Sequence, residues 1–328
     1  MLSRNEWDPL KKVIVGRADH ARVPEMDISL RTINYADLDP SRVPPAGLYP
    51  SQIIQEANED LEIFCDFLRS VGVEVLRPDE SVVPGYYNYC PRDSVLVHDD
   101  LILATPQPLR ARHQEYLAMD RHFKSLQDQG ARYVIKMADK TDSLYNNKCL
   151  GNKDVLALTD VEPAFDAANI LRDNNNLYYL ISNGGNRSGA AYLQELVGSN
   201  KKVWLVEDVY SFMHIDSTIS LLREGLMLLN PSRIKDKSQL PKPLQSWDVI
   251  WAPDPGEVWH YPGYCNASPW LNVNLFSVNP SLAVILQGQD ELARRLESHG
   301  IQCKMLPGRH QRTLGGGFHC VTLDLARS

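Results

Sequence analysis

The sequence has no long hydrophobic run and no excess of basic charge. A transmembrane helix needs about 18 or more consecutive apolar residues, and no run approaches that length, so we expect no membrane span. The net charge of −7 argues against a nucleic-acid partner, because phosphate binding requires a concentrated basic face. Residues 1–7 show neither the apolar core of an export signal nor an amphipathic, Arg-rich presequence. We therefore expect a cytoplasmic protein.

The sequence also lacks a closely spaced pair of cysteines. Six cysteines are scattered along the chain without a CxxC motif, which in a protein of this size indicates free thiols in a reducing compartment. A zinc site is not expected, because His319 and Cys320 are adjacent and lack the spacing of metal ligands. The six are Cys65, Cys90, Cys149, Cys265, Cys303 and Cys320.

One structural unit recurs along the chain. The 328 residues are 43% apolar and 23% charged, as in an ordinary globular protein, and they suffice for one large domain or two smaller ones. The unit consists of a helix with one apolar face, then a glycine, then a strand, although the fourth copy lacks the glycine. The five copies lie around residues 53–76, 126–135, 193–206, 240–251 and 292–305.

The segments between these copies are predicted to form β-hairpins, with two apolar stretches around a polar turn. One hairpin combines residues 321–323 with residues 13–15, which would close a ring and remove exposed sheet edges. Any α/β protein alternates helices and strands, but five similar units in succession favour the ring. The other hairpins are predicted at residues 95–103, 170–181, 219–228 and 273–284.

The sequence therefore predicts an α/β fold with five pseudo-symmetric ββαβ units. They would form a five-bladed propeller around a central active site, within a single domain that spans residues 1–328. A polar cluster precedes each hairpin, and rotation of the units would bring the five clusters to the central axis. Carboxylates, an imidazole, a hydroxyl and a thiol would then share one cleft. The clusters are residues 91–93, 165–169, 213–216, 266–268 and 315–320.

Cys320 and His214 are the candidate reactive groups. Three glycines precede Cys320, which frees backbone N–H groups and lets a ligand approach closely. A thiolate is a strong nucleophile once cationic charge lowers its pKa, although a lone cysteine is more often structural. His214 could act as acid and base, and a hydrogen-bonded core histidine is an equally good interpretation of this fragment. In a strand, Asp216 would share its face and either orient the ring or bind substrate.

Asp93 and Asp166 are candidates for recognising a cation. Two carboxylates in one pocket suit the N–H donors of a planar guanidinium, whereas elsewhere such an aspartate is usually a cap or surface group. Arg233 could hold a substrate carboxylate, although a surface arginine is the commoner case. Ser268 is a further hydrogen-bonding candidate.

Several stretches resemble the amidinotransferases, a family that includes the glycine and inosamine-phosphate enzymes. The likeness spans nearly the whole chain in the same order, and Gly-Gly-Gly-Phe-His-Cys at residues 315–320 is its most specific part. The family belongs to the guanidine-modifying enzymes of the pentein fold, which also contains arginine deiminase. The matching stretches are residues 5–10, 13–16, 91–93, 165–168, 213–216, 230–233 and 314–320.

This resemblance implies a ping-pong reaction without a metal or an organic cofactor. The amidino group of L-arginine would pass to Cys320, releasing ornithine, and then to an acceptor amine. His214 would be the acid and base, with Asp166 as its carboxylate partner. The family also implies a homodimer.

The resemblance further implies contacts to the substrate. Asp93 and Asp216 would bind the guanidinium, while Arg233 and Ser268 would contact the amino-acid end of arginine. One departure bears on the acceptor: only residues 80–90 separate two motifs that are further apart in the family, so the mouth of the site differs.

Residues 211–213 lie where the family distinguishes its acceptors. Met213 is like the glycine-using enzymes, but Ser211 is small where those have Asn, which predicts an amine larger than glycine from specialised metabolism. The alternative is an arginine deiminase-like hydrolase that gives citrulline, and the exclusion of water from the site favours transfer over hydrolysis. A non-catalytic member of the fold would lack a reactive group, yet all are present.

Overall fold

The computed structural model describes residues 2–82, 85–136, 139–210 and 212–328. Ser211, predicted to influence acceptor choice, lies outside these residues. Within them, the strands form five three-stranded sheets and one two-stranded sheet. In each three-stranded sheet the middle strand is antiparallel to one neighbour and parallel to the other. A hairpin supplies the antiparallel pair in four of these sheets, the two ends of the chain supply it in the fifth, and a longer crossover supplies the parallel pair in all five.

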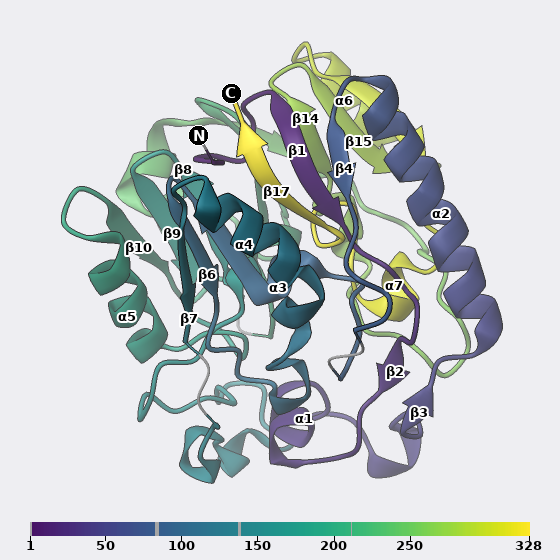
Figure 1. The fold of residues 1–328 in the computed structure, drawn as a ribbon, viewed down its shortest axis with the longest axis vertical. Helices are drawn as coiled ribbons and strands as arrows, with labels where there is room; N and C mark the ends of the chain where they lie inside the picture. Colours follow the sequence, from purple (N-terminus) through teal and green to yellow (C-terminus); the bar gives the residue numbers. More distant parts are fainter. Residues whose placement is uncertain (1, 83–84, 137–138, 211) are drawn as a thin grey trace.

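The first sheet contains both ends of the chain. β1 (Leu10–Val15) lies between β17 (Thr322–Arg327), which is antiparallel to it, and β4 (Glu74–Leu76), which is parallel. Figure 1 shows the purple β1 beside the yellow β17. Val13, Ile14 and Val15 pair with residues 322–324, so the N-terminal and C-terminal segments share one ladder of hydrogen bonds.

The other three-stranded sheets follow the chain in order, each with a hairpin and then a third strand. The two-stranded sheet pairs β2 (Arg22–Val23) with β3 (Gly47–Leu48). The strands of the four sheets are β5 (Val95–His98), β6 (Leu101–Ala104) and β7 (Arg132–Ile135); β8 (Ile170–Asp173), β9 (Asn176–Leu180) and β10 (Lys202–Val206); β11 (Ile219–Arg223), β12 (Leu226–Leu229) and β13 (Asp248–Trp251); and β14 (Phe276–Asn279), β15 (Leu282–Leu286) and β16 (Gln302–Leu306).

Four of the predicted helices are confirmed. Each is followed by a glycine with φ between +77° and +102°, a left-handed conformation that ends a helix and that side chains with a Cβ rarely adopt. The helices and their glycines are α2 (Ser51–Ser70) with Gly72, α4 (Asp120–Asp128) with Gly130, α5 (Arg187–Val197) with Gly198, and α6 (Asp290–Glu297) with Gly300.

Two predicted elements are wrong. The helix expected near residues 240–244 is replaced by short 3-10 helices at Lys237–Gln239 and Lys242–Ser246, because the prolines at 241 and 243 lack the N–H that a continuous helix needs. The strand expected at residues 273–275 begins later, as β14. Residues 273–275 instead form the loop before that strand, where Asn274 N donates to Leu271 O at 3.0 Å.

Each sheet packs against the next through a cluster of buried apolar side chains. In β5, Val95 and Val97 pack with Ile14 of the first sheet, whereas Leu96 packs with Leu177 of the sheet that follows. Equivalent clusters join the third sheet to the fourth and the fourth to the fifth. A further cluster joins the fifth sheet back to the first, with α2 on its outer side. Each three-stranded sheet therefore has buried apolar side chains on both of its faces.

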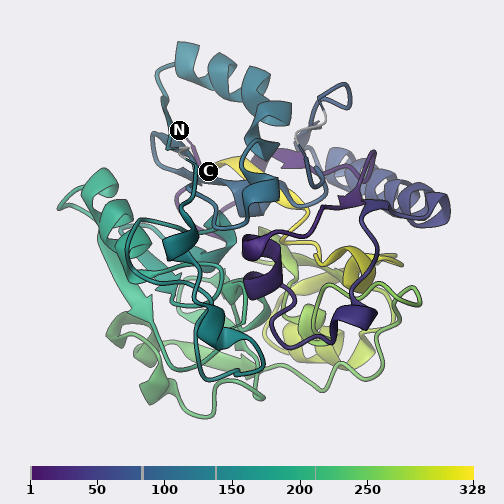
Figure 2. The same cartoon turned by 90° about the horizontal axis from the view of Figure 1, so that it is seen from below.

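Short helices connect the sheets at the end where the predicted polar clusters lie. α3 (Pro91–Ser94) and α7 (Gln311–Leu314) carry or precede two of these clusters. α1 (Ile28–Ile33) is capped by Asp27, whose side chain accepts a hydrogen bond from Leu30 N. In the view from below, α1 lies near the middle of the molecule (Figure 2).

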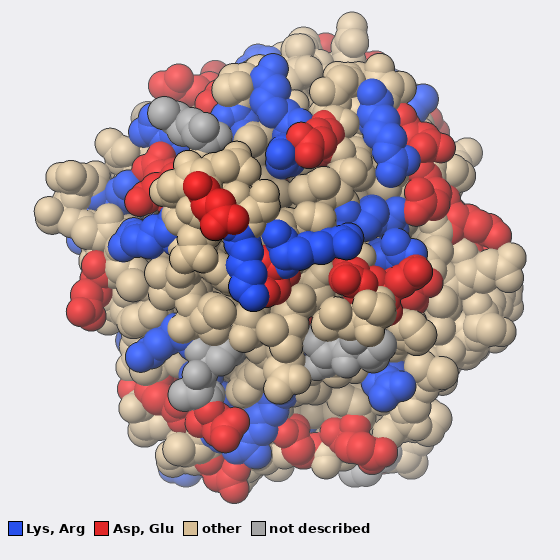
Figure 3. Space-filling model, viewed as in Figure 1, with Lys and Arg blue, Asp and Glu red and all other residues tan. Residues whose placement is uncertain are grey.

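The exposed surface is mixed in charge. Basic and acidic side chains lie beside one another over the face shown in Figure 3. None of the described helices is both long enough and apolar enough to cross a bilayer.

A buried ionic cluster lies between the first sheet and its neighbours. Arg172 Nη2 lies 2.7 Å from Glu6 Oε2 and 2.6 Å from Asp324 Oδ2, and Arg92 Nη2 lies 2.5 Å from Asp324 Oδ1. Burial opposes ionisation of Glu6 and Asp324, but the charge on Arg172 and the charges and hydrogen bonds of the neighbouring groups together outweigh it. They lower both carboxyl pKa values well below their usual range. The cluster is thus ionised at neutral pH.

Replacing Arg172 by Met should lower the free energy of unfolding by about 3–5 kcal/mol, because two buried carboxylates lose the cation that bridges them. Arg132 offers a matched control, since its side chain is 48% exposed and pairs at the surface. Arg132→Met should change stability by at most about 1 kcal/mol. Urea unfolding of both variants measures the difference, and equal effects would show that burial of the cluster contributes nothing.

Candidate active site

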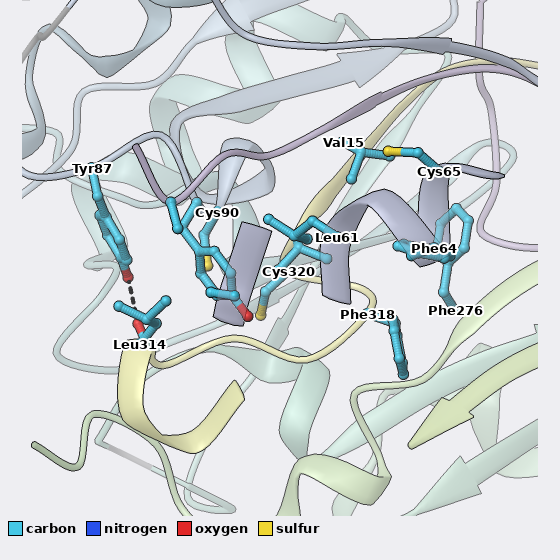
Figure 4. Close-up of a cluster of buried hydrophobic side chains, with 14 of the residues drawn as sticks. Val15, Leu61, Phe64, Cys65, Tyr87, Cys90, Phe276, Leu314, Phe318 and Cys320 are labelled. Carbon is cyan, nitrogen blue, oxygen red and sulfur yellow. Dashed lines mark hydrogen bonds between the residues drawn. The ribbon is translucent and has the colours of Figure 1, made fainter. Parts of the chain in front are cut away.

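Cys320 lies in the turn between α7 and β17. Gly315 there has φ +92° and ends α7. The next two glycines permit close packing: a Cβ on Gly316 would lie 2.5 Å from Cys90 Sγ, and one on Gly317 would lie 2.7 Å from Asn274 Oδ1. Figure 4 shows Cys320 among the side chains of a buried cluster, between Cys90 on one side and Phe64, Phe276 and Phe318 on the other. The glycine run therefore lets the turn fit between the core and its polar neighbours.

The sulfur of Cys320 has polar groups around it. The thiol donates to Asp216 Oδ2 at 3.2 Å, and the sulfur accepts from Asn274 Nδ2 at 3.1 Å. The neighbouring Cys90 thiol, burial and the charge of Asp216 raise the pKa of the Cys320 thiol well above its usual value, against the effect of a hydrogen bond with His214. In the free protein Cys320 is thus held as a thiol.

His214 lies between two carboxylates. Its Nε2 is 3.0 Å from Asp166 Oδ2, and its Nδ1 is 3.7 Å from Asp93 Oδ1. Burial lowers the pKa of the imidazole, but the charge of Asp93 and the hydrogen bond to Asp166 together raise it well above its usual value. His214 is therefore an imidazolium at neutral pH, with both nitrogens available as donors.

The strand geometry predicted for residues 214–216 is wrong. His214 caps a 3-10 helix, Ile215–Ser217, because Thr218 N bonds to Ile215 O at 2.8 Å and closes a turn in place of a strand ladder. Asp216 reaches the same site from inside this turn. Its Oδ2 accepts from His319 Nδ1 at 2.8 Å. Burial opposes the charged form of Asp216, but the hydrogen bond and charge of His319 lower its pKa below the usual value.

Asp93 has one satisfied oxygen and one free oxygen. Oδ2 accepts from Arg112 Nη1 at 2.7 Å, whereas Oδ1 is buried without a hydrogen-bond partner among the described residues. Burial raises the pKa of this carboxyl, although His214 and Arg112 act in the opposite direction. Asp166 is held by Gln107, whose Nε2 donates to Oδ1 at 3.2 Å. The unpaired oxygen of Asp93 is suited to an N–H donor from a ligand.

Arg233 and Ser268 meet on the other side of the site. Arg233 Nη2 donates to Ser268 Oγ at 3.1 Å, and Nη1 donates to Ser217 O at 2.9 Å. The guanidinium stacks on Tyr210, with its carbon 3.5 Å from the ring centroid. Arg233 forms no ion pair within the described part of the chain, and partial burial lowers the pKa of its guanidinium. A partly buried cation of this kind favours an anionic ligand.

Three cavities adjoin these groups. Two have volumes of about 50 Å³ and share Met213 and His214 in their walls; one reaches Cys320 and the other reaches Asp93. The third has a volume of about 430 Å³ and shares Tyr210, Phe212 and Ser268 with the cavity at Cys320, while Arg233 also lines it.

The structure thus brings together Asp93, Asp166, His214, Asp216 and Cys320, all singled out from the sequence. Four neighbours were missed: Asn274, His319, Gln107 and Arg112. In the described ranges, no group of three or more His, Cys, Asp or Glu side chains is arranged to hold a metal ion.

Asn274 occupies a position that is polar in every unit, but the wrong prediction of a strand at residues 273–275 hid this. In each unit a polar residue stands two to four positions before the first strand. With the strand starting at residue 276, Asn274 falls into this series. The residues and the strands that they precede are Asp93 before β5, Asp166 before β8, Asp216 before β11, Asn274 before β14 and Cys320 before β17.

Comparison with known proteins relates this geometry to a family, although no family model matches the chain. The inosamine-phosphate amidinotransferase 1 of Streptomyces glaucescens is 39% identical over 99% of this chain and 96% of its own length. The mitochondrial glycine amidinotransferase of Danio rerio is 30% identical over 99% of this chain and 82% of its own length.

Solved structures agree with these relatives. The inosamine-phosphate amidinotransferase of Streptomyces griseus superposes with a TM-score of 0.91 at 39% identity, covering 100% of this chain and 97% of that one. SxtG, an amidinotransferase of Microseira wollei from the saxitoxin pathway, gives 0.89 at 28% identity, covering 99% and 97%. DDAH from Pseudomonas aeruginosa gives 0.63 at 13% identity over 96% of this chain and 99% of that one, which shows the fold alone. The chain has the α/β pentein fold and is a member of the amidinotransferase family.

Proposed function

We propose that this transferase moves the amidino group of L-arginine to an acceptor amine through a covalent intermediate on Cys320. One observation carries the proposal: a buried thiol and an imidazolium share a site with three carboxylates, and Asp93 Oδ1 has no hydrogen-bond partner among the described residues. A guanidinium fills this deficit of positive charge, because its planar N–H groups match carboxylate oxygens.

Arginine binds with its guanidinium against Asp93, Asp166 and Asp216, and its carboxylate against Arg233 and Ser268. The arriving cation stabilises the Cys320 thiolate, so the thiol releases its proton to solvent as the guanidinium binds beside the sulfur, while His214 keeps its own proton.

The first half-reaction uses the imidazolium directly. The thiolate forms a bond to the guanidinium carbon, and the bond between that carbon and arginine Nε breaks. His214 gives its proton to Nε, which departs as the side-chain amine of ornithine. Asp166 holds the ring in place through the 3.0 Å contact.

In the second half-reaction the acceptor nitrogen attacks the amidino carbon. Neutral His214 takes the acceptor proton, the carbon–sulfur bond breaks, and Cys320 is restored. Water attacking this amidino-cysteine would give urea, because ornithine has already left, so the acceptor must occupy the space that ornithine vacates. Citrulline would form only if ammonia left in the first half-reaction and the ornithine chain stayed on the intermediate. The 430 Å³ cavity next to this space supports an acceptor larger than glycine, from specialised metabolism.

We also propose that the five three-stranded sheets are the blades of one propeller formed by a single domain, residues 1–328. The cyclic order of the hydrophobic clusters supports this, because the last cluster returns from β15 to β1. All six cysteines are unpaired, which supports a cytoplasmic location. A homodimer stays a prediction of the family resemblance.

Protein quenched after incubation with arginine alone should carry an amidino group on Cys320 and release ornithine. Cys320→Ala should abolish both, whereas Cys303→Ala on the outer strand β16 should change neither. Peptide mass spectrometry and amino-acid analysis measure the two products. Citrulline as the main product without acceptor would reject amidino transfer.

The value of kcat/KM for arginine should follow a bell-shaped pH profile with its maximum on the alkaline side of neutral. The rate rises as Cys320 ionises, above the usual thiol range near about 8.5, and falls when His214 loses its proton. The pKa values of the Cys320 thiol and of His214 are both raised in the free protein, so the rising and the falling limb of the profile both lie at high pH. A maximum below neutral pH would contradict these assignments.

A screen of amines with arginine, read out as ornithine release, should favour amino acids or aminocyclitols larger than glycine. Phe212 lines the large cavity and is 39% exposed, so Phe212→Trp should reduce the rate with large amines more than with glycine. Strong and exclusive use of glycine would overturn the acceptor proposal.

A further inference from the structure

We propose that Asn274 is a catalytic residue whose side-chain amide donates a hydrogen bond to the sulfur of Cys320 and stabilises its thiolate. The inference rests on the proposed function, in which Cys320 is the nucleophile. It adds a group from the fifth unit, where the sequence indicated a strand.

The orientation of the Asn274 amide follows from its partners. Cys320 N donates to Asn274 Oδ1 at 3.1 Å, and Asn274 Nδ2 lies 3.1 Å from Cys320 Sγ. A backbone N–H is only a donor, so the oxygen of the amide must face it. The NH₂ group must then face the sulfur. The two bonds fix the amide and leave no alternative in which the oxygen approaches the sulfur.

The fold holds Asn274 at this position before any substrate arrives. Its backbone N donates to Leu271 O at 3.0 Å, and its carbonyl accepts from His319 N at 3.3 Å. The side chain is buried, with 2% of the residue exposed. Gly317 allows the approach, because a Cβ there would lie 2.8 Å from Asn274 O.

The hydrogen bond from Asn274 to Cys320 matters because the other groups around the sulfur mostly disfavour its negative charge. Asp216 lies 3.2 Å away and disfavours negative charge on Cys320, as does burial. His214 counters them only while it is an imidazolium, and it loses its proton to the departing nitrogen. The amide of Asn274 is a neutral donor in every step. It can therefore stabilise the sulfur both as nucleophile and as leaving group.

Two substitutions separate this role from positioning. Asn274→Ala removes both hydrogen bonds. Asn274→Asp keeps an oxygen for Cys320 N, and so keeps the positioning contact, but replaces the donor by a carboxylate. Asn272 provides the control: it is also buried, at 3% exposure, and its Nδ2 donates to Pro253 O at 2.9 Å, away from the sulfur. Asn272→Asp introduces a similar charge without touching Cys320.

The primary measurement is the rate of iodoacetamide alkylation of Cys320 against pH in the folded, substrate-free protein, with the modified peptide identified by mass spectrometry. Asn274→Ala should lower the rate at neutral pH by about 10- to 100-fold and move the profile to higher pH, because a hydrogen bond to a charged group is lost. Asn274→Asp should lower it further. Asn272→Asp should leave the profile unchanged even if it lowers the melting temperature.

An Asn274→Asp protein with the alkylation profile of the native protein would overturn the proposal, since positioning alone would then suffice. If Asn274→Asp does not fold, Asn274→Ala decides: an unchanged profile overturns the proposal, and a shifted one supports it. Alkylation requires no amidino transfer, so this test is independent of ornithine release. Failure of the proposed function would appear as no ornithine from the native protein, whatever the alkylation result.

Discussion

The site depends on the balance of charge around one buried sulfur. A buried carboxylate is costly unless cations or donors compensate for it, and three of them surround Cys320. In the free protein His214 supplies a positive charge between Asp93 and Asp166. Under the proposed function, the guanidinium supplies a second charge and only then favours the thiolate. Recognition of a planar cation and activation of the nucleophile thus have the same electrostatic cause.

The buried ionic cluster connects this site to the scaffold. Glu6 Oε2 lies 3.4 Å from His319 Nε2, and His319 in turn holds Asp216. Arg92 Nε donates to His319 O at 2.7 Å, and Arg172 bridges Glu6 to the last strand. The N-terminal segment, two hairpin units and the C-terminal strand therefore share one set of charges. This arrangement couples the position of the Cys320 turn to the pairing of β1 with β17.

The spacing of apolar residues predicted most helices and strands, and the predictions that were wrong have physical causes. The helix–glycine–strand units depend on residues a few positions apart, so periodicity found four of the helices. Val273 and Leu275 alternate with a polar residue as a strand would, yet both are buried in a loop. Alternation of apolar and polar residues cannot distinguish a strand from this loop, because Val273 and Leu275 are buried in the loop as they would be in a strand. That error moved the first strand of the unit and concealed Asn274.

The sequence by itself determined the types of most elements and the family, and it predicted the candidate reactive groups, because these depend on local spacing and on side-chain chemistry. Only the tertiary structure decided the protonation of His214 and Cys320, the unpaired oxygen of Asp93 and the orientation of Asn274. Each depends on burial and on partners far away in the chain: the contact between His319 and Asp216 spans 103 positions. Electrostatic energies act through space, and no local pattern records which charges will meet there.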